Sequence, residues 1–127
     1  MVSFKRIHHV ALLVKDIENS QSFYENHFGF ETYFEEDTQS GVRVVCLRLD
    51  DTVLELRAGE VHPNGYGGCY FCMESEDLVG DVESLKKAGV PVDQEIHDTT
   101  PRNHQERRWD RAVFKGPDGE LIEIRGR

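Results

Sequence analysis

Two glutamates stand in the same apolar context at two places in the chain. Glu55 lies in residues 53–57 and Glu123 lies in residues 121–125, and the two segments match residue for residue in type. A carboxylate between branched apolar residues is costly to bury unless it pairs with a cation or binds a metal. Two such glutamates in matching contexts indicate a duplicated half-domain whose carboxylates face a shared, inward-facing site.

A histidine near the start of the chain is a third candidate for this site. His9 follows His8 in an apolar stretch that we expect to be a buried strand. A lone histidine in such a strand is more often a hydrogen-bonded core residue, but the two matched glutamates favour a metal ligand at His9. His8 is expected on the opposite face, with a structural role or at the surface. For Glu123 the competing interpretation is a buried ion pair with Arg125 or Arg57.

A basic segment interrupts this acidic chain at residues 102–111. Its arginines, Arg102 and Arg107 among them, could bind carboxylates or phosphates of a thiol-conjugated substrate, and Trp109 could form a wall of the pocket. A solvated charged loop would have the same composition, so the sequence leaves both interpretations open. We take Arg102, Arg107 and Trp109 as candidate substrate-binding residues.

The composition narrows the class of protein. At 127 residues the chain has the length of one domain with its own core. The net charge of −9 argues against a nucleic-acid partner, which needs a basic surface, and leaves small metabolites and metal cations as partners. No apolar run approaches the roughly 18 residues of a membrane helix. The first residues lack the apolar core of a signal peptide, so we expect a cytoplasmic protein.

The three cysteines do not form a disulfide framework, because their number is odd. Cys69 and Cys72 are spaced as a C-x-x-C motif, but they lie in an expected strand. Their odd separation puts them on opposite faces of that strand, which suits neither zinc binding nor a redox pair. We therefore expect all three cysteines to be reduced and mostly buried as small apolar residues.

The order of expected elements repeats once along the chain. The expected helices are residues 18–28 and 77–88, and the expected strands are residues 6–14, 30–35, 41–49, 52–57, 68–74, 91–96, 111–115 and 120–125. Gly29 and Gly89 end the two helices, and residues 58–67 form a turn-rich linker. Residues 1–58 and 66–127 thus each read β-α-β-β-β, which predicts a single α+β domain built from an internal repeat.

Three segments together resemble one known superfamily. Residues 9–16 (HVALLVKD), residues 23–30 with their Phe-Tyr and Phe-Gly-Phe, and residues 116–123 (GPDGELIE) resemble the vicinal oxygen chelate superfamily. That superfamily includes glyoxalase I, methylmalonyl-CoA epimerase, extradiol dioxygenases, fosfomycin-resistance enzymes and bleomycin-resistance proteins. The resemblance implies two βαβββ modules forming a curved mixed sheet, a cup with the helices outside, around a divalent metal. It also implies a homodimer, as in many members.

The resemblance assigns a role to each candidate ligand. His9 matches the first-half histidine ligand, Glu55 matches the first-half ligand of glyoxalase I, and Glu123 matches the most widely shared ligand. The fourth place holds a histidine in metal-dependent members, but here it falls on Gly68 or Tyr70. A tyrosine or cysteine on that strand, or a histidine from elsewhere, could substitute; the candidate histidines are His62, His97 and His104.

The function implied by the resemblance is a metal-dependent lyase or isomerase like glyoxalase I. A divalent ion (Zn²⁺, Ni²⁺, Mn²⁺ or Co²⁺) held by His9, Glu55 and Glu123 would stabilise an enediolate of a small oxygenated substrate. A glutamate, Glu123 rather than Glu55, would remove the proton and return it one carbon along. Tyr70 joins the candidate substrate-binding residues, because its strand faces the cup.

Two alternatives belong to other functional classes. The missing histidine favours a metal-free binding protein like the bleomycin-resistance members, whereas His9, Glu55 and Glu123 together argue against it. An extradiol-type dioxygenase ranks third, because its Fe²⁺ requires two histidines and one carboxylate. The sequence does not identify the substrate, the metal or the arrangement of a dimer.

Overall fold

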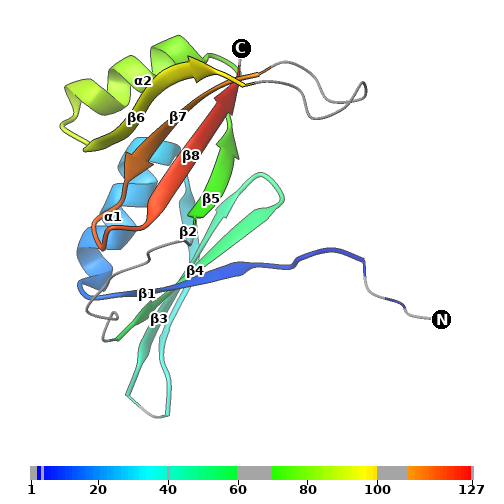
Figure 1. Ribbon diagram of the computed structural model, residues 1–127. Helices are drawn as coiled ribbons and strands as arrows, with labels where there is room; N and C mark the ends of the chain where they lie inside the picture. The colour runs from blue at the N-terminus through cyan, green and yellow to red at the C-terminus, as the bar shows by residue number, and fades with distance from the viewer. Residues whose placement is uncertain (1–2, 4, 40, 60–69, 100–108, 127) are drawn as a thin grey trace. The chain divides into compact units, whose positions relative to one another are not determined.

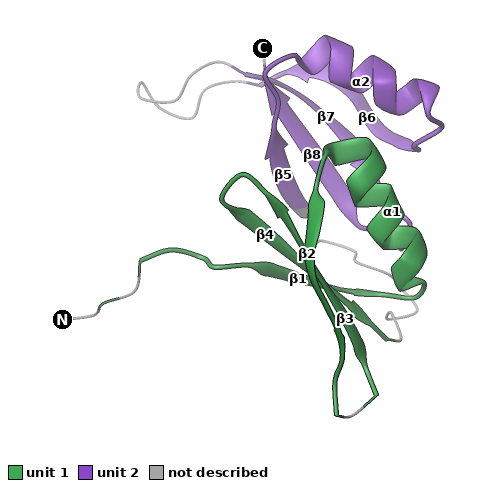
Figure 2. Cartoon of the chain, turned by 180° about the vertical axis from the view of Figure 1, so that it is seen from behind, with its two compact units in different colours: residues 1–61 green, residues 62–127 purple. Residues whose placement is uncertain are grey.

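The computed structural model describes residues 3, 5–39, 41–59, 70–99 and 109–126. The chain divides into two compact units, Met1–Val61 and His62–Arg127, coloured separately in Figure 2. Each unit contains four strands and one helix in the order β-α-β-β-β, so the predicted α+β fold with two βαβββ modules is confirmed.

The two units share one topology. Unit 1 comprises β1 (Val10–Val14), α1 (Ile17–Phe28), β2 (Glu31–Asp37), β3 (Arg43–Leu49) and β4 (Thr52–Ala58). Unit 2 comprises β5 (Tyr70–Glu74), α2 (Leu78–Lys87), β6 (Val92–Asp98), β7 (Asp110–Lys115) and β8 (Leu121–Gly126). The strand orders are β1-β4-β3-β2 and β5-β8-β7-β6, and in each sheet the first pair is parallel and the others antiparallel (Figure 1).

Both helices begin and end at the residues that favour these positions. The Asp16 side chain accepts a hydrogen bond of 3.0 Å from the Asn19 backbone at the start of α1. Asp77 does the same for α2, accepting from a backbone N–H one turn later. Gly29 and Gly89 adopt φ values of 76° and 81°, a left-handed conformation that a glycine enters without the steric cost of a Cβ atom. The predicted ends of both helices are confirmed to within one residue.

Each helix covers one face of its own sheet, and that face forms the core of the unit. In unit 1 the fully buried Tyr24 of α1 belongs to the same core as Leu54 and Leu56 of β4. In unit 2 the core face of β8 carries Ile122 and Ile124. Because strand side chains alternate between faces, the glutamate between each of these apolar pairs lies on the face away from the helix.

The tight turn before β8 also buries a carboxylate that the sequence did not single out. In this turn, the Gly119 N–H donates to the Gly116 carbonyl at 3.0 Å, and Gly119 has φ of 83°. Glu120 follows it with only 1% of its surface exposed, and its Oε1 accepts the Asp118 N–H at 2.9 Å. This hydrogen bond inside the turn gives Glu120 a structural role.

The predicted strand at residues 6–14 is wrong over its first four residues. Strand β1 begins only at Val10, which pairs with Leu54, and Ile7 is 81% exposed. Strand β1 lies at the edge of its sheet with β4 as its neighbour, and the pairing of the two strands begins at Val10, so the residues before Val10 lie outside the ladder. Nor is β1 buried on both faces, because Val10 and Leu13 are exposed. Among the described helices, none is long and apolar enough to cross a membrane.

Candidate metal and substrate site

Unit 1 brings two of the predicted ligands together. Glu55 lies on β4, and His9 precedes β1, the parallel neighbour of β4. The Nε2 atom of His9 is 3.8 Å from Oε2 of Glu55, and an Nη1 atom of Arg57 is 3.7 Å from the same oxygen. Both distances exceed hydrogen-bond length, so neither nitrogen atom donates a hydrogen bond to Glu55 Oε2.

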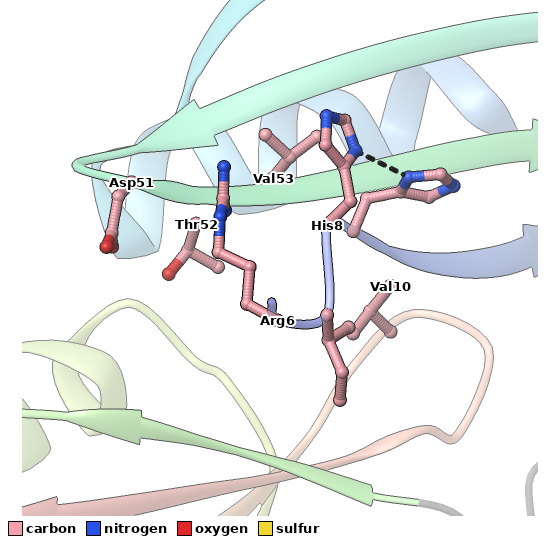
Figure 3. Close-up of a pocket in the computed structure, with 8 residues that line it drawn as sticks. Arg6, His8, Val10, Asp51, Thr52 and Val53 are labelled. Atoms are coloured by element: carbon pink, nitrogen blue, oxygen red, sulfur yellow. Dashed lines mark hydrogen bonds between the residues drawn. The ribbon is translucent and has the colours of Figure 1, made fainter. Parts of the chain in front are cut away.

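His8 contacts His9, contrary to the prediction that it lies on the opposite face. The Nδ1 atoms of the two rings are 3.0 Å apart, and the ring planes are nearly perpendicular at 88°. Alternation fails here because both residues precede the first strand residue, Val10. Figure 3 shows this contact beside a cavity of about 380 Å³. Its lining residues are Arg6, Ile7, His8, His9, Val10, Asp51, Thr52 and Val53.

Unit 2 surrounds its own glutamate with arginines. Glu123 is 6% exposed, and its Oε1 accepts a hydrogen bond of 3.1 Å from Nε of Arg125. The Nε of Arg111 lies 2.8 Å from the same oxygen in an ion pair that lacks hydrogen-bond alignment. Of the predicted pairings for Glu123, the one with Arg125 is therefore present. Arg57, the other predicted partner, approaches Glu55 instead.

A cysteine lies directly across from each glutamate in its sheet. Cys46 is the β3 neighbour of Glu55, and Cys72 is the β5 neighbour of Glu123. Partial burial, followed by the Glu123 charge, raises the pKa of the Cys72 thiol to about 11. Burial and then the Glu55 charge also raise the pKa of Cys46. Both described cysteines are unpaired thiols, as predicted, and both are protonated near neutral pH. The predicted burial is wrong for Cys72, which is exposed, and Cys46 is only partly buried.

The strand registers decide which residue occupies the place of the missing histidine. In each unit, the glutamate pairs with a residue on the parallel neighbouring strand. Two positions before that residue stands His9 in unit 1 and Tyr70 in unit 2. The repeat therefore equates Tyr70, rather than Gly68, with His9. Gly68 and the side chain of Tyr70 lie outside what the structure describes.

One predicted substrate-binding residue lines a second cavity. Trp109 borders a space of about 310 Å³ together with Cys72, Glu74 and Arg125. Arg102 and Arg107 lie outside the described residues, as do two of the three substitute histidines, His62 and His104. The third, His97, lies on β6, and its Nδ1 is 2.9 Å from a backbone carbonyl of the same strand.

The donor pair in unit 1 fits a divalent metal in type. Two ligand atoms of a tetrahedral zinc ion lie roughly 3.4 Å apart, so the 3.8 Å between His9 and Glu55 is slightly wider than a bound ion would require. Imidazole with carboxylate is a donor set that zinc and other divalent transition metals accept. Within the described parts of the chain, no group of three His, Cys, Asp or Glu side chains is close enough to hold an ion. The pair is therefore part of a site rather than a complete one.

The sequence of the chain matches a known family over almost its whole length. The model of the Glyoxalase/Bleomycin resistance protein/Dioxygenase superfamily matches residues 6–124. This chain belongs to that superfamily. The match spans both units and includes all the candidate ligands.

Relatives of this superfamily member are named as epimerases. The chain is 34% identical over 98 residues to an ethylmalonyl-CoA/methylmalonyl-CoA epimerase of Cereibacter sphaeroides, covering 68% of this chain and 73% of the relative. It is 32% identical over 96 residues to the human mitochondrial methylmalonyl-CoA epimerase, covering 67% of this chain. The match covers 54% of that human protein, so the superfamily member described here spans about half of its length.

Solved structures share the fold of this superfamily member. A fosfomycin resistance protein from Listeria monocytogenes, crystallised with manganese(II) and sulfate, matches with a TM-score of 0.76 and 15% identity. That match covers 98% of this chain and 94% of the other. An integron cassette protein from Vibrio cholerae matches with a TM-score of 0.74 and 21% identity, over 99% and 98% of the two chains. At these identities, the likeness concerns the fold.

The sequence analysis did not predict two contacts of the candidate ligands, one made by Arg111 and one made by His8. Arg111 contacts Glu123 because β7 pairs with β8 in a register that puts Arg111 opposite Arg125. Two like charges opposite each other in a sheet are unfavourable unless an anion lies beside them, and this was the available signal. His8 contacts His9 because the strand starts later than predicted. The apolar pattern of residues 6–14 did not indicate that the strand starts only at Val10.

Proposed function

We propose that this superfamily member is a metal-dependent isomerase of the epimerase type. Its reaction removes and returns a proton on the carbon between the carbonyl groups of a carboxylated thioester. The observation that carries the proposal is the His9–Glu55 donor pair, 3.8 Å apart, in a chain 34% identical to an ethylmalonyl-CoA/methylmalonyl-CoA epimerase. The glyoxalase I-like reaction expected from the sequence uses related chemistry, and the named relatives favour the epimerase within that class.

The proposed metal ligands in unit 1 are His9 and Glu55, and the resemblance stated from the sequence adds Glu123 of unit 2 as a further candidate. A divalent ion at these residues would stabilise negative charge on adjacent substrate oxygens and thereby acidify the neighbouring C–H bond. Manganese(II) in a structural neighbour supports a divalent ion, without naming the one used here. Oε2 of Glu55 lies 3.8 Å from Nε2 of His9, so these two atoms would be the ligand atoms of such an ion in unit 1.

Glu123 is also the proposed proton acceptor. Nitrogen atoms of Arg111 and Arg125 contact its Oε1, which fixes the orientation of the carboxylate. A proton-transfer group must be held within hydrogen-bond reach of the carbon-bound proton, so a fixed orientation favours this role. Glu123 is largely shielded from water, which strengthens its electrostatic interactions with a bound substrate.

The proposed substrate class rests on the positive charge of Arg125 and on the aromatic ring of Trp109, which border the same cavity. A carboxylated thioester is an anion, and Arg125 borders the cavity of about 310 Å³ beside Trp109. The single tryptophan of the chain would pack against an apolar part of the substrate. Arg102 and Arg107 remain candidates for binding more distant phosphate groups.

Exchange of the transferred proton with solvent tests the proposal. Methylmalonyl-CoA and ethylmalonyl-CoA are incubated in deuterium oxide with the protein and Mn²⁺, Co²⁺, Ni²⁺ or Zn²⁺, and deuterium at the acidic carbon is measured by mass spectrometry. Faster incorporation than in buffer with metal alone, abolished by a chelator and by His9→Ala, is the expected result. Protein that binds a metal yet leaves both thioesters at the buffer rate would refute the epimerase assignment.

A metal-free binding protein is the second candidate function. The observations that favour it are Tyr70 at the position equivalent to His9 and the two arginines that neutralise Glu123. Trp109 fluorescence provides a direct test, because it is the only tryptophan and it lines a cavity. Saturable quenching by bleomycin in the presence of a chelator would support this function. The dioxygenase remains third, because the register puts Tyr70 where a second histidine ligand would stand.

A further inference from the structure

The arrangement of His8, His9 and Glu55 carries an inference that rests on the proposed metal site. One ring nitrogen of His9, Nδ1, is 3.0 Å from Nδ1 of His8, and the other, Nε2, is 3.8 Å from Oε2 of Glu55. A neutral imidazole carries a single N–H, so a proton on Nδ1 leaves a lone pair on Nε2. A metal ligand needs that lone pair, so the contact with His8 bears directly on metal binding.

The two distances favour one position for the His9 proton. A separation of 3.0 Å between two ring nitrogens is that of a hydrogen bond, in which one ring donates and the other accepts. If His8 were the donor, His9 would carry its own proton on Nε2, facing the Glu55 carboxylate. An N–H donor to a carboxylate closes to about 2.8 Å, not to the 3.8 Å found here. If His9 is the donor, the lone pair on its Nε2 faces a lone pair on Glu55 Oε2. These two atoms repel each other, which explains their wider separation.

We propose that His8 is a positioning residue, which accepts the Nδ1 proton of His9 and so holds His9 in the tautomer whose Nε2 binds a divalent metal. Metal-binding histidines in proteins usually donate the other ring N–H to a carboxylate, a carbonyl or a water molecule, and these partners fix both the tautomer and the ring orientation. Here the neighbouring residue in the chain provides the acceptor.

The start of the first strand makes this contact possible. Adjacent residues within a strand point to opposite faces, so two histidines inside β1 could not meet through their rings. His8 and His9 both precede Val10, the first residue of β1, and their rings meet edge to face with centroids 5.2 Å apart. Figure 3 shows the bond between the two rings beside the cavity of about 380 Å³. The late start of β1 therefore allows the His8 ring to contact the His9 ring.

Two substitutions separate the hydrogen bond from the bulk of the side chain. His8→Asn places an amide oxygen near the position of Nδ1 and keeps an acceptor for His9, whereas His8→Leu fills similar space without one. His8 is exposed and outside the sheet, so both variants are expected to fold, which circular dichroism verifies. His9→Ala identifies the His9 signals among those of the other histidines.

The first readout is the position of the proton itself. Nitrogen NMR of the histidine rings, recorded without metal at about pH 8 where imidazole is neutral, distinguishes the two tautomers. We expect the Nδ1–H form of His9 in the wild type and in His8→Asn. In His8→Leu we expect the Nε2–H form to predominate, as it does for free imidazole side chains in water.

The second readout is metal affinity. Calorimetric titration with Zn²⁺ is expected to show binding about 10–100-fold weaker in His8→Leu and nearly unchanged in His8→Asn. An unchanged His9 tautomer in His8→Leu would overturn the assignment, and so would a changed tautomer joined to an unchanged Zn²⁺ affinity. If the wild type binds no Zn²⁺, the proposed function fails, while the tautomer of His9 in the two variants still decides the role of His8.

Discussion

Glu55 and Glu123 occupy equivalent positions on β4 and β8, but their charged partners differ. Each has an arginine two residues further along its strand, and Glu123 has a second one, Arg111, at 2.8 Å. The position equivalent to Arg111 in unit 1 is Val44, because these residues lie opposite the strand arginines of their units. The two halves of the repeat have therefore diverged, with a histidine–glutamate pair in unit 1 and an arginine–glutamate cluster in unit 2.

The stability of the fold should depend unequally on the two glutamates. The Glu123 side chain is 8% exposed, so Glu123→Gln leaves two arginines partly buried without a counter-charge. We expect this change to lower the free energy of unfolding by about 3 kcal/mol. The Glu55 side chain is more exposed and its partners are more distant, so Glu55→Gln should cost at most about 1 kcal/mol. Urea unfolding of the two matched variants checks this, and equal losses would contradict it.

The Arg111–Glu123 contact should be measurable as a coupling energy. Arg111→Val introduces the residue type found at the equivalent position of unit 1, so it should preserve the sheet. Urea unfolding of Arg111→Val, Glu123→Gln and the double variant forms a double-mutant cycle. We expect a coupling of about 1–3 kcal/mol, as for contacting residues in one ion-pair network. Additive effects of the two substitutions would show that the two charges do not stabilise each other.

The Cys72 thiol should react slowly at moderate pH. Partial burial and the Glu123 charge raise its pKa to about 11, so the reactive thiolate is scarce below that pH. In a Cys46→Ser, Cys69→Ser background, the rate of iodoacetamide alkylation should rise about tenfold per pH unit and level off near pH 11. Glu123→Gln removes a charge that opposes ionisation, so the profile should move to lower pH. A plateau near pH 8.5, the range of an unperturbed thiol, would contradict this prediction.

Restoring the missing histidine should strengthen metal binding. Tyr70 is equivalent to His9 in the repeat, and imidazole is a better ligand than a phenol for a divalent transition metal. We expect Tyr70→His to tighten Zn²⁺ binding by about 10-fold or more in calorimetric titration, whereas Tyr70→Phe, the matched control, should change it little. Weaker binding in Tyr70→His than in Tyr70→Phe would show that a histidine at position 70 is not a metal ligand.

Local signals in the sequence predicted most of the fold. Glycines at 29 and 89 predicted the ends of both helices, because a glycine enters the left-handed conformation that ends a helix. In the structure, Asp16 and Asp77 cap the starts of the same helices. The repeated glutamate segment predicted the equivalence of β4 and β8. These features depend on neighbours a few residues away in the chain, so a single sequence contains them.

The partners of the candidate ligands could be predicted only in part. The Arg125–Glu123 pair lies within one strand, and the sequence suggested it. The Arg111–Glu123 contact depends on the register between β7 and β8, which a single strand does not encode. The His8 contact depends on β1 starting at Val10, and the apolar pattern extends further back than the pairing with β4 does. Contacts set by register and by strand ends therefore needed the structure.

Metal content tests the central claim most directly. The protein without tags, purified without chelator and incubated separately with Zn²⁺, Mn²⁺, Ni²⁺ and Co²⁺, is desalted and measured by elemental analysis beside His9→Ala and Glu55→Ala. We predict close to one tightly held divalent ion per chain in the wild type and its loss in both variants. A wild-type protein that retains none of the four ions, or variants that retain as much as the wild type, would contradict a metal site at His9 and Glu55.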